Sequence, residues 1–385
     1  MSMFYELMMR KKEETMYATI KGSPTESPEG VFSGFSASNY LRINQTIVWD
    51  NNAEIVCTFT MPSSALTNAM TNLFVGKYSS SARNGFTIYT TGGKSYIYAN
   101  LNLAGVDTNT YINIVPLELG QTYTAKLIFN GSSYLLCLYQ NGIKLGEKTI
   151  SSSSIMSTNS GFFIGSFENS NFFTGSIDLN NSYIKLGSTK YNLQAVVGYT
   201  VVGSPTITDG VVSGFQAYPN VNSGYYVKIA NFTYNNTFEI KVKIRTGETI
   251  GGTILGQGNP APRAGIPATS LRNTNFSFNI KDQNNQDIVN LVNIGYVNER
   301  TLIVDTDYIL TLKFTGTEYI YTLVDMNGAY YINRVISSSA KLRVGCLAFG
   351  INYADVAYSA WSGAIDMNET WIKTDNKLFF NGQQA

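Results

Sequence analysis

Two acidic residues, Asp178 and Asp366, hold the same place in two similar stretches of the chain, FFTGSIDLNNSYIK at 172–185 and AWSGAIDMNETWIK at 360–373. Hydrolysis of a glycosidic bond needs two carboxyl groups, one to protonate the leaving oxygen and one to attack or to activate water. Asp366 is followed by a second acid, Glu369, but the first copy has an asparagine there. An Asp that follows a strand usually accepts backbone N–H bonds in the next turn. We therefore expect both residues to be structural turn carboxylates, and we expect no enzyme.

The residue types that most often supply general bases and metal ligands are missing or isolated. The chain contains no histidine, the commonest general base and transition-metal ligand. Its three cysteines, Cys57, Cys137 and Cys346, lie far apart in apolar runs, which favours buried free thiols over a disulfide or metal framework. The stretch KDQNNQD at 281–287 offers oxygen ligands for Ca²⁺ but lacks the glycine and the last glutamate of an EF-hand loop. We predict no cofactor and no metal site; calcium is possible but unsupported.

Aromatic residues in predicted loops are the remaining candidates for a binding site. The chain has 26 Tyr and 21 Phe, more than two cores should need. Flat rings beside Asn and Asp can stack on the apolar face of a sugar while amides bond its hydroxyls. The same rings can instead pack in a core or an interface, and that alternative stays open for each of them. The candidate ligand-binding residues are Phe172, Phe173, Tyr218, Tyr353 and Tyr358.

The elements that position these residues occur twice. GSPTESPEGVFSGF at 22–35 is matched by GSPTITDGVVSGF at 203–215, and later segments match in the same order. Each copy has roughly 180 residues, the size of a complete domain rather than of a solenoid repeat. We predict a tandem pair of domains, 16–194 and 195–385, without a flexible linker between them.

Hydrophobic periodicity predicts the fold class. Apolar and polar residues alternate in 123–129 and again in 308–314, the pattern of a half-buried strand. Each of these runs leads into a second alternating run that ends in Asn-Gly, a hairpin turn signal. Further short strands are expected at 53–61, 86–91, 94–103, 161–167, 225–230 and 238–244. The prediction is an all-β protein with two antiparallel β-sandwich domains.

The N-terminal residues 1–15 are set apart from the first domain. Residues 2–14 show a helical spacing of apolar side chains and three methionines. This segment is either a frayed leader or a short docking or oligomerisation helix. The chain has no stretch of 18 apolar residues and no basic block, and its net charge is +1. Neither a membrane span nor a nucleic-acid partner is therefore expected, nor is a cleavable export signal.

Several strands resemble the concanavalin A-like (laminin G-like) jelly-roll domains. The run F-x-G-x-I-D at 173–178 follows SGFFIGS at 160–166, and the second copy has a looser version of both. Y-x-x-x-L-x-F-x-G at 123–131 and 308–316 is also similar to the family. The resemblance implies jelly-roll sandwiches, which can bind glycans or calcium. It does not extend to the Glu-x-Asp-x-x-Glu strand of the family's glucanases, because no Glu here is followed two residues later by Asp.

The tandem jelly-roll pattern, the surface rich in Asn, Ser, Thr and Gly, and the missing catalytic groups look like bacteriophage virion proteins that carry such domains. The resemblance implies a non-enzymatic structural or decoration protein of a phage head, collar or tail. It would sit on the virion surface, attach to other virion proteins or to its own copies through its N-terminal segment, and bind host-surface glycans. The alternatives are a bacterial carbohydrate-binding or adhesion module at the cell surface and a degenerate glycoside hydrolase.

Overall fold

The chain folds into two compact units, unit 1 (Met1–Ala195) and unit 2 (Val196–Ala385), and each is described by itself. The computed structural model describes residues 13–382, apart from 28–29, 65–70, 78–85, 91–95, 104–105, 113–115, 157–160, 167–170, 217–224, 233, 258–267, 283, 285, 343–344, 351–359 and 376. For some strand residues the description is limited to the backbone.

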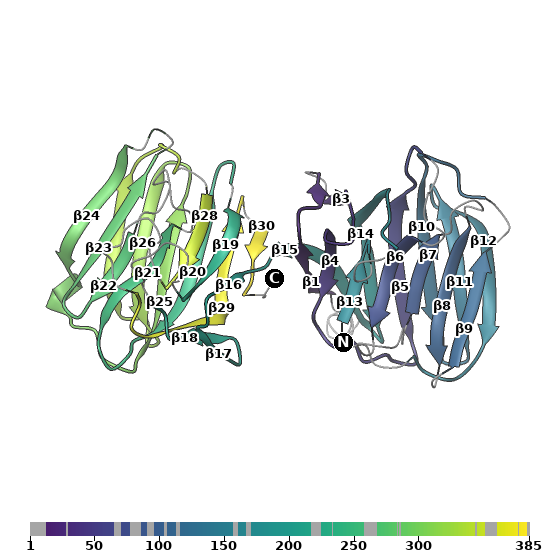
Figure 1. The fold of residues 1–385 in the computed structure, drawn as a ribbon, viewed down its shortest axis with the longest axis horizontal. Helices are drawn as coiled ribbons and strands as arrows, with labels where there is room; N and C mark the ends of the chain where they lie inside the picture. Colours follow the sequence, from purple (N-terminus) through teal and green to yellow (C-terminus); the bar gives the residue numbers. More distant parts are fainter. Residues whose placement is uncertain are drawn as a thin grey trace, which may run out of the picture. The chain divides into compact units, whose positions relative to one another are not determined.

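Unit 1 is built from fifteen strands (Figure 1). They are β1 (Glu13–Lys21), β2 (Thr25–Glu26), β3 (Val31–Ser33), β4 (Tyr40–Ile43), β5 (Ala53–Thr60), β6 (Thr71–Lys77), β7 (Phe86–Thr90), β8 (Ile97–Leu103), β9 (Val106–Ile112), β10 (Thr122–Phe129), β11 (Ser133–Gln140), β12 (Ile143–Ser151), β13 (Gly161–Ile164), β14 (Ser176–Leu186) and β15 (Thr189–Val197). One layer runs β12-β11-β10-β5-β14, the other runs β4-β13-β6-β7-β8-β9, and β15 and β1 connect them. The short strands β2 and β3 extend the first layer beside β14.

Unit 2 repeats this architecture with two separate sheets (Figure 1). Its elements are β16 (Thr200–Val202), β17 (Thr206–Thr208), β18 (Val211–Ser213), β19 (Tyr226–Phe232), β20 (Phe238–Arg245), β21 (Gly251–Gln257), β22 (Ala268–Arg272), β23 (Asn275–Lys281), β24 (Asp287–Gly295), the 3₁₀ turn η1 (Val297–Glu299), β25 (Asp307–Phe314), β26 (Glu318–Asp325), β27 (Tyr330–Ser337), β28 (Gly345–Phe349), β29 (Ala364–Thr374) and β30 (Lys377–Phe380). The sheets run β16-β19-β28-β21-β22-β23-β24 and β17-β18-β29-β20-β25-β26-β27, with β30 beside β29.

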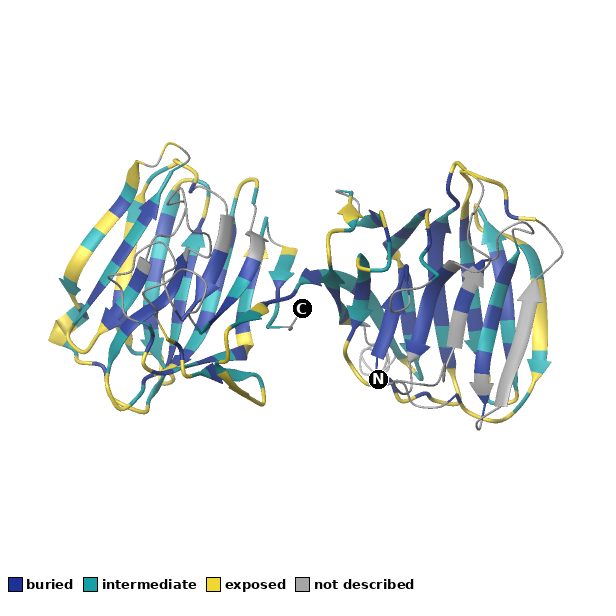
Figure 2. Cartoon of the chain, viewed as in Figure 1, coloured by how far each residue is buried: buried dark blue, intermediate teal, exposed yellow. Residues whose placement is uncertain are grey.

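The alternation predicted from the sequence is seen in the burial of the strands (Figure 2). In β25 the side chains of Tyr308, Leu310, Leu312 and Phe314 are at most 1% exposed, whereas the residues between them are half-buried. The same two-residue period holds in β10, β20 and β23. Each unit thereby fills its own core, and within unit 2 the Phe278 ring of one sheet stacks on the Tyr321 ring of the other with centroids 4.2 Å apart. The predicted all-β class with two antiparallel sandwiches is confirmed.

The N-terminal segment is the one part of the chain expected to be helical. Residues 1–12 of the expected N-terminal segment lie outside the described residues, so their docking role stays a prediction. Its last residues, 13–15, are not helical but begin β1, because Met16 and Ala18 alternate into the core of unit 1 and extend the strand pattern backwards. Within the described ranges, no helix is long and apolar enough to span a membrane.

The same core contacts recur at matching positions of the two units. In unit 1 the hydroxyl of Tyr134 donates to the carbonyl of Ser154 at 2.8 Å, and in unit 2 Tyr319 donates to Ala340 at 2.7 Å. These two tyrosines are accommodated in the cores because their hydroxyls find backbone partners. The excess of tyrosine noted in the sequence is therefore partly used inside the units.

Candidate functional site

Two of the five aromatic residues expected to bind a ligand, Phe172 and Phe173, lie among the described residues. Tyr218, Tyr353 and Tyr358 lie outside the described residues. Phe172 is half-buried and packs against the core of unit 1.

Phe173 was expected on the surface as a ligand-binding residue, but it is fully buried in the core of unit 1. Its ring contacts Phe59 edge-on with centroids 6.0 Å apart. The backbone N–H of Phe173 donates to Gly165, just as that of Trp361 donates to Gly350 in unit 2. Phe173 is therefore the counterpart of a core tryptophan, and its position after a polar loop segment gave a misleading surface signal.

Asp178 and Asp366 lie on the outer faces of β14 and β29. A carboxylate oxygen of Asp178 accepts the backbone N–H of Asn181 at 3.1 Å, and one of Asp366 accepts the backbone N–H of Asn368 at 3.1 Å. Each carboxylate thus bonds the backbone that follows it, an arrangement typical of a turn carboxylate.

Both Asp residues begin a bulge in their strand. In β14, Asp178 is opposite Thr58 and Tyr183 is opposite Val56, so three extra residues are looped out. The Ser182 hydroxyl spans the gap, because it accepts the N–H of Thr58 at 3.0 Å and donates to the carbonyl of Asp178 at 2.5 Å. A bulge of this kind disrupts the ladder locally and re-aims the side chains that follow it.

In β29 the hydroxyl of Thr370 spans the bulge in the same way. Thr370, 1% exposed, donates to the carbonyl of Asp366 at 2.7 Å and accepts the N–H of Lys243 at 3.4 Å. Residues that hold the same ladder position in the two units are called equivalent below; Thr370 is equivalent to Ser182, and Trp371 to Tyr183.

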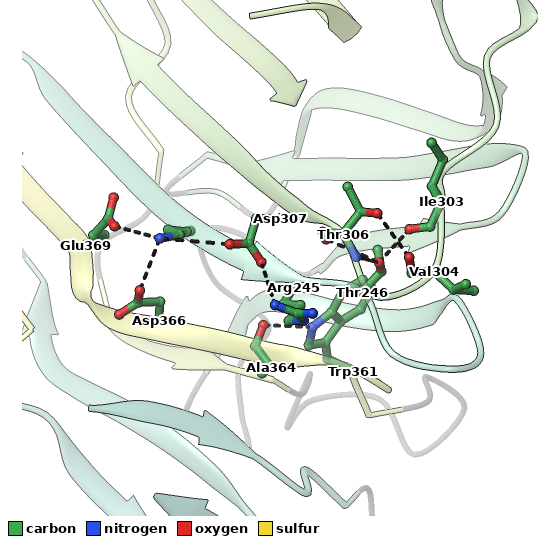
Figure 3. A network of polar contacts seen from close by, with 11 residues as sticks. Arg245, Thr246, Ile303, Val304, Thr306, Asp307, Trp361, Ala364, Asp366 and Glu369 are labelled. Carbon is green, nitrogen blue, oxygen red and sulfur yellow. Dashed lines mark hydrogen bonds and ion pairs between the residues drawn. The ribbon is translucent and has the colours of Figure 1, made fainter. Parts of the chain in front are cut away.

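A charged network surrounds the bulge in unit 2 (Figure 3). The amine of Lys243 lies 2.6 Å from a carboxylate oxygen of Glu369, 3.3 Å from one of Asp366 and 4.0 Å from one of Asp307. Arg245 approaches the other oxygen of Asp307 at 3.7 Å. Three carboxylates thus converge on one lysine on the outer face of β20, β25 and β29.

The electrostatics of this network favour the ionised form of Glu369. The hydrogen bond from Lys243 holds the pKa of Glu369 below its usual value, and the same bond raises the pKa of Lys243. A glycosidase acid needs the opposite shift, because it must stay protonated at the working pH. The network therefore stabilises Glu369 in its ionised form.

Unit 1 carries neutral hydroxyls at the equivalent place. Thr58, equivalent to Lys243, bonds Thr124 with 3.0 Å between the hydroxyl oxygens, and Thr60 bonds Thr122 at 2.8 Å. Thr58 also donates to the carbonyl of Asn181 at 3.0 Å. The charged network is thus a feature of unit 2 and not of the shared architecture.

An aromatic surface follows the bulge in unit 1. The half-buried Tyr183 donates its hydroxyl to Glu54 at 3.0 Å, and the amine of Lys126 lies 3.7 Å from the same carboxylate oxygen. Burial, followed by the charge of Glu54, raises the pKa of Tyr183 to about 12, so its hydroxyl remains a donor. Lys126 also lies over the ring of Tyr139, 5.3 Å from its centroid, and Lys190 lies 4.9 Å from the centroid of Tyr183. We call Tyr183, Glu54, Lys126 and Tyr139 the Tyr183 surface.

Unit 2 presents a related surface at the same place. The half-buried Trp371 is directly opposite Lys241, and the amine of Lys373 lies 4.7 Å from the centroid of the Trp371 ring. Glu239, equivalent to Glu54, is opposite Lys373 and lies 3.7 Å from the amine of Lys313. We call these five residues the Trp371 surface. Each unit thus places an aromatic ring, a glutamate and lysines on the outer face of one sheet.

Tyr183 and Trp371 were not among the candidate residues predicted from the sequence, although their equivalence is visible in SYIK and TWIK. Regular alternation from Asp178 would point Tyr183 inward, and only the bulge returns the ring to the outer face. The available signal was the polar pair Asn180-Asn181 inside an otherwise alternating strand, which marks a local irregularity.

The outer face of the other sheet in unit 2 carries amides instead of rings. Asn279 is opposite Asn290 and donates to its side-chain oxygen at 3.3 Å. Asn290 donates in turn to Asp287 at 3.2 Å, and Asp287 forms an ion pair of 2.7 Å with Lys281. We call Asn279, Asn290, Asp287 and Lys281 the amide surface. Variants on this surface are controls for experiments on the aromatic surfaces.

In the KDQNNQD segment, whose residues 283 and 285 are not described, both carboxylates have protein partners. Its first carboxylate, Asp282, accepts the backbone N–H groups of Asn284 and Gln286 at 2.9 and 2.8 Å. Its last, Asp287, is engaged by Lys281. Among the described residues, no three side chains of the His, Cys, Asp and Glu types converge as metal ligands do.

A scan against protein-family models finds no match, and a search of curated protein sequences finds none. Among solved structures, the chain is similar to domains LG4-5 of the mouse laminin alpha1 chain, with 12% identity, a TM-score of 0.32, and coverage of 96% of this chain and 97% of that one. It is also similar to a SAP-like pentraxin from Limulus polyphemus (19% identity, TM-score 0.31, 44% of this chain and 78% of that one). The carbohydrate-binding module CBM66 from Bacillus subtilis matches 46% of this chain over 98% of its own, with 11% identity and a TM-score of 0.30. All three TM-scores are below 0.5, so these likenesses carry no argument about a ligand.

Proposed function

We propose that this chain is a non-enzymatic carbohydrate-binding protein and that each unit binds saccharide on the outer face of one sheet, through the Tyr183 surface and the Trp371 surface. The single observation that carries the proposal is the recurrence of an aromatic ring and a glutamate at equivalent positions of the two units, each with lysines nearby.

The chemistry of these groups suits a sugar. A ring fixed on a sheet can stack on the apolar C–H face of a pyranose, while carboxylate and amine groups at its rim exchange hydrogen bonds with the hydroxyls. The bond between Tyr183 and Glu54 fixes the ring before a ligand arrives. Binding then immobilises few additional groups, which lowers its entropic cost.

Binding without hydrolysis is supported by the state of the acids next to these surfaces. Glu369 is held in its ionised form by Lys243. Asp178 and its neighbour Asn181 give unit 1 one carboxylate where a glycosidase needs two.

The proposal is tested by applying the full chain to an array of oligosaccharides and titrating the strongest ligands. The variants are Tyr183→Ala, Trp371→Ala and the double variant, with Tyr183→Phe and Trp371→Phe as controls that keep a ring. We expect roughly a tenfold loss of affinity from the double variant, as for one or two stacking contacts, and little change in the phenylalanine variants. The Asn279→Ala variant should bind like wild type, because Asn279 lies on the amide surface.

Three results would contradict the proposal. The double alanine variant, shown to be folded by circular dichroism, could bind as tightly as wild type. Asn279→Ala could abolish binding, which would move the site to the amide surface. Incubation with the bound oligosaccharide could release shorter sugars, which would show that the chain is a hydrolase.

The setting proposed for this activity is the surface of a bacteriophage particle, where the chain decorates the virion and contacts host-surface glycans. Support comes from the sequence resemblance and from a composition with only 14% charged residues. A bacterial cell surface is the alternative setting. Mass spectrometry of purified particles from the producing culture should detect the chain; its absence there would overturn the phage setting and leave the binding proposal standing.

A further inference from the structure

The aromatic surfaces of the two units differ in charge at one equivalent position. Tyr183 is directly opposite Val56, whereas Trp371 is directly opposite Lys241. Side chains directly opposite each other in an antiparallel pair share a face and lie about 5 Å apart at their Cβ atoms. At this ladder position unit 2 therefore has a cation where unit 1 has an apolar side chain, although a different lysine, Lys190, lies 4.9 Å from the centroid of the Tyr183 ring.

The glutamates of the two surfaces are also engaged differently. In unit 1 both the Tyr183 hydroxyl and the Lys126 amine reach Glu54. In unit 2 the aromatic residue is a tryptophan, which has no hydroxyl to offer, and Glu239 pairs with Lys313 at 3.7 Å with both side chains about a third or more exposed. An exposed pair of this kind holds its partners weakly.

The Trp371 surface consequently carries more positive than negative charge. Lys241, Lys313 and Lys373 face a single carboxylate, Glu239. The charge of Lys241 also helps to lower the pKa of Glu369, but the amine that contacts Glu369 at 2.6 Å is that of Lys243. Lys241 on β20 and Lys373 on β29, the strand that carries the ring, remain as donors for an anion.

We propose that the Trp371 surface binds acidic saccharides, in which a sugar ring bears a carboxylate. The ring of Trp371 stacks on the apolar face of the sugar, and the amines of Lys241 and Lys373 bind its carboxylate. The Tyr183 surface should show a weaker preference for an acid group, because Val56 stands where unit 2 has Lys241 and Lys126 is engaged by Glu54. This inference rests on the proposed function and adds the class of ligand for unit 2.

The test compares the full-length wild type with Lys241→Val, Trp371→Ala and Tyr183→Ala. Lys241→Val installs the residue that unit 1 has at the equivalent position, so the strand should tolerate it. Lys148→Val removes one lysine from the exposed edge strand β12 of unit 1 and is the matched control for net charge. The probes are oligomers of galacturonate, glucuronate and mannuronate, each beside its neutral methyl ester.

We expect wild type to bind at least one acid more tightly than its ester, and Lys241→Val to lose about tenfold for the acid, as for one charge-assisted hydrogen bond, with little change for the ester. Trp371→Ala should lose most of the acid preference, while Tyr183→Ala and Lys148→Val keep it. Raising the salt from about 50 to 300 mM should weaken the acid alone, because screening acts on the charges.

Other outcomes separate the two proposals. If wild type binds esters and acids equally, and the alanine variants weaken both, the proposed function stands and the acid preference is wrong. If Lys241→Val keeps the full preference, Lys241 is not the group that creates it and the inference fails. If wild type binds neither these probes nor any glycan of a broad array, the proposed function itself is overturned.

Discussion

Equivalent residues of the two units differ in both the core and the outer face, although the fold is the same. Phe173 and Trp361 occupy equivalent places in the two cores, and Tyr183 and Trp371 do so on the two outer faces. The core pair differs in size but keeps the same backbone contact. The outer pair differs in its polar group, which decides how the adjacent glutamate is held.

The core tryptophan gives the first prediction. Trp361 is 1% exposed and donates its ring N–H to the carbonyl of Ala364 at 3.3 Å. Because unit 1 accommodates phenylalanine at this place, Trp361→Phe should lower the free energy of unfolding by about 1–2 kcal/mol, whereas Trp361→Ala should lower it by about 3–5 kcal/mol. Urea denaturation measures both. A loss of under about 1 kcal/mol for the alanine variant would show that the ring is not a core element.

The lysine of the charged network gives the second prediction. Lys243, 15% exposed, is shared by the carboxylates of Glu369, Asp366 and Asp307. Lys243→Met should lower the free energy of unfolding by about 1–2 kcal/mol, because three carboxylates lose a common cation. The control is Lys144→Met, which breaks a pair whose side chains are each 48% exposed and should leave the free energy of unfolding nearly unchanged. Equal effects in denaturant titrations would contradict the account of the network.

At the scale of elements, the bulges in β14 and β29 decide which side chains face outward. From Asp178 to Tyr183 the strand advances five residues while its partner advances two. An odd number of steps in a regular strand reverses the face, so without the bulge Tyr183 would point into the core. Ser182 and Thr370 hold the bulges closed by replacing missing ladder bonds.

The third prediction concerns these hydroxyls. Ser182→Ala leaves the N–H of Thr58 and the carbonyl of Asp178 without their partner and should cost about 1–3 kcal/mol, as for unsatisfied buried groups. It should also speed hydrogen exchange at the Thr58 amide, which exchange measured by NMR would detect. Ser152→Ala, which removes an exposed bond to the Ser154 amide, is the control and should change neither quantity measurably. Unchanged exchange at Thr58 in Ser182→Ala would show that the hydroxyl does not close the bulge.

The strands could be predicted from the sequence because alternation is a local property. Residues such as Tyr308 and Leu310 point inward in both the pattern and the structure. The candidate site could not be predicted in the same way, because it depends on three extra residues whose effect on register appears only when β14 is paired with β5. The conformation of the two Asn-Gly turns could not be predicted from the dipeptide alone. In the first turn both Asn141 and Gly142 have positive φ, whereas in the second only Gly328 does. The second turn is held instead by Asp325, which accepts N–H bonds from Asn327 and Ala329.

At the scale of the whole molecule, the chain repeats a core and varies its outer charges. Unit 1 lines the outer face near its bulge with threonines, and unit 2 lines the same place with Lys243 and its carboxylates. The two units should therefore respond differently to acid, although their cores are alike.

The fourth prediction follows from three carboxylates of unit 2 whose pKa values lie below the usual range. Hydrogen bonds from Lys243 and Lys281 lower the pKa of Glu369 and of Asp287. For Asp375, burial alone would raise the pKa, but backbone N–H bonds from residues 235–237 together lower it. A carboxylate with a lowered folded-state pKa adds stability above its unfolded pKa, about 4, and that stability disappears as pH falls through the folded value.

Unit 2 should accordingly unfold at a higher pH than unit 1 during acid titration. Tryptophan fluorescence separates the units, because Trp49 reports on unit 1 and Trp361 and Trp371 report on unit 2. A Trp49→Phe variant isolates the signal of unit 2, and a Trp361→Phe/Trp371→Phe variant isolates that of unit 1. Acid unfolding of unit 1 before unit 2 would contradict this account of the charges.

The central claim is that sugar meets the ring of Trp371 on an outer face, and the three tryptophan indoles allow it to be tested directly. In a ¹H–¹⁵N NMR spectrum of the full chain labelled on tryptophan, the buried Trp49 and Trp361 provide internal references, being 5% and 1% exposed. Titration with the oligosaccharide that binds best should shift the Trp371 indole signal, identified by its loss in Trp371→Phe, saturably and leave the other two in place. A Trp371 signal that stays still while the sugar demonstrably binds would contradict the account.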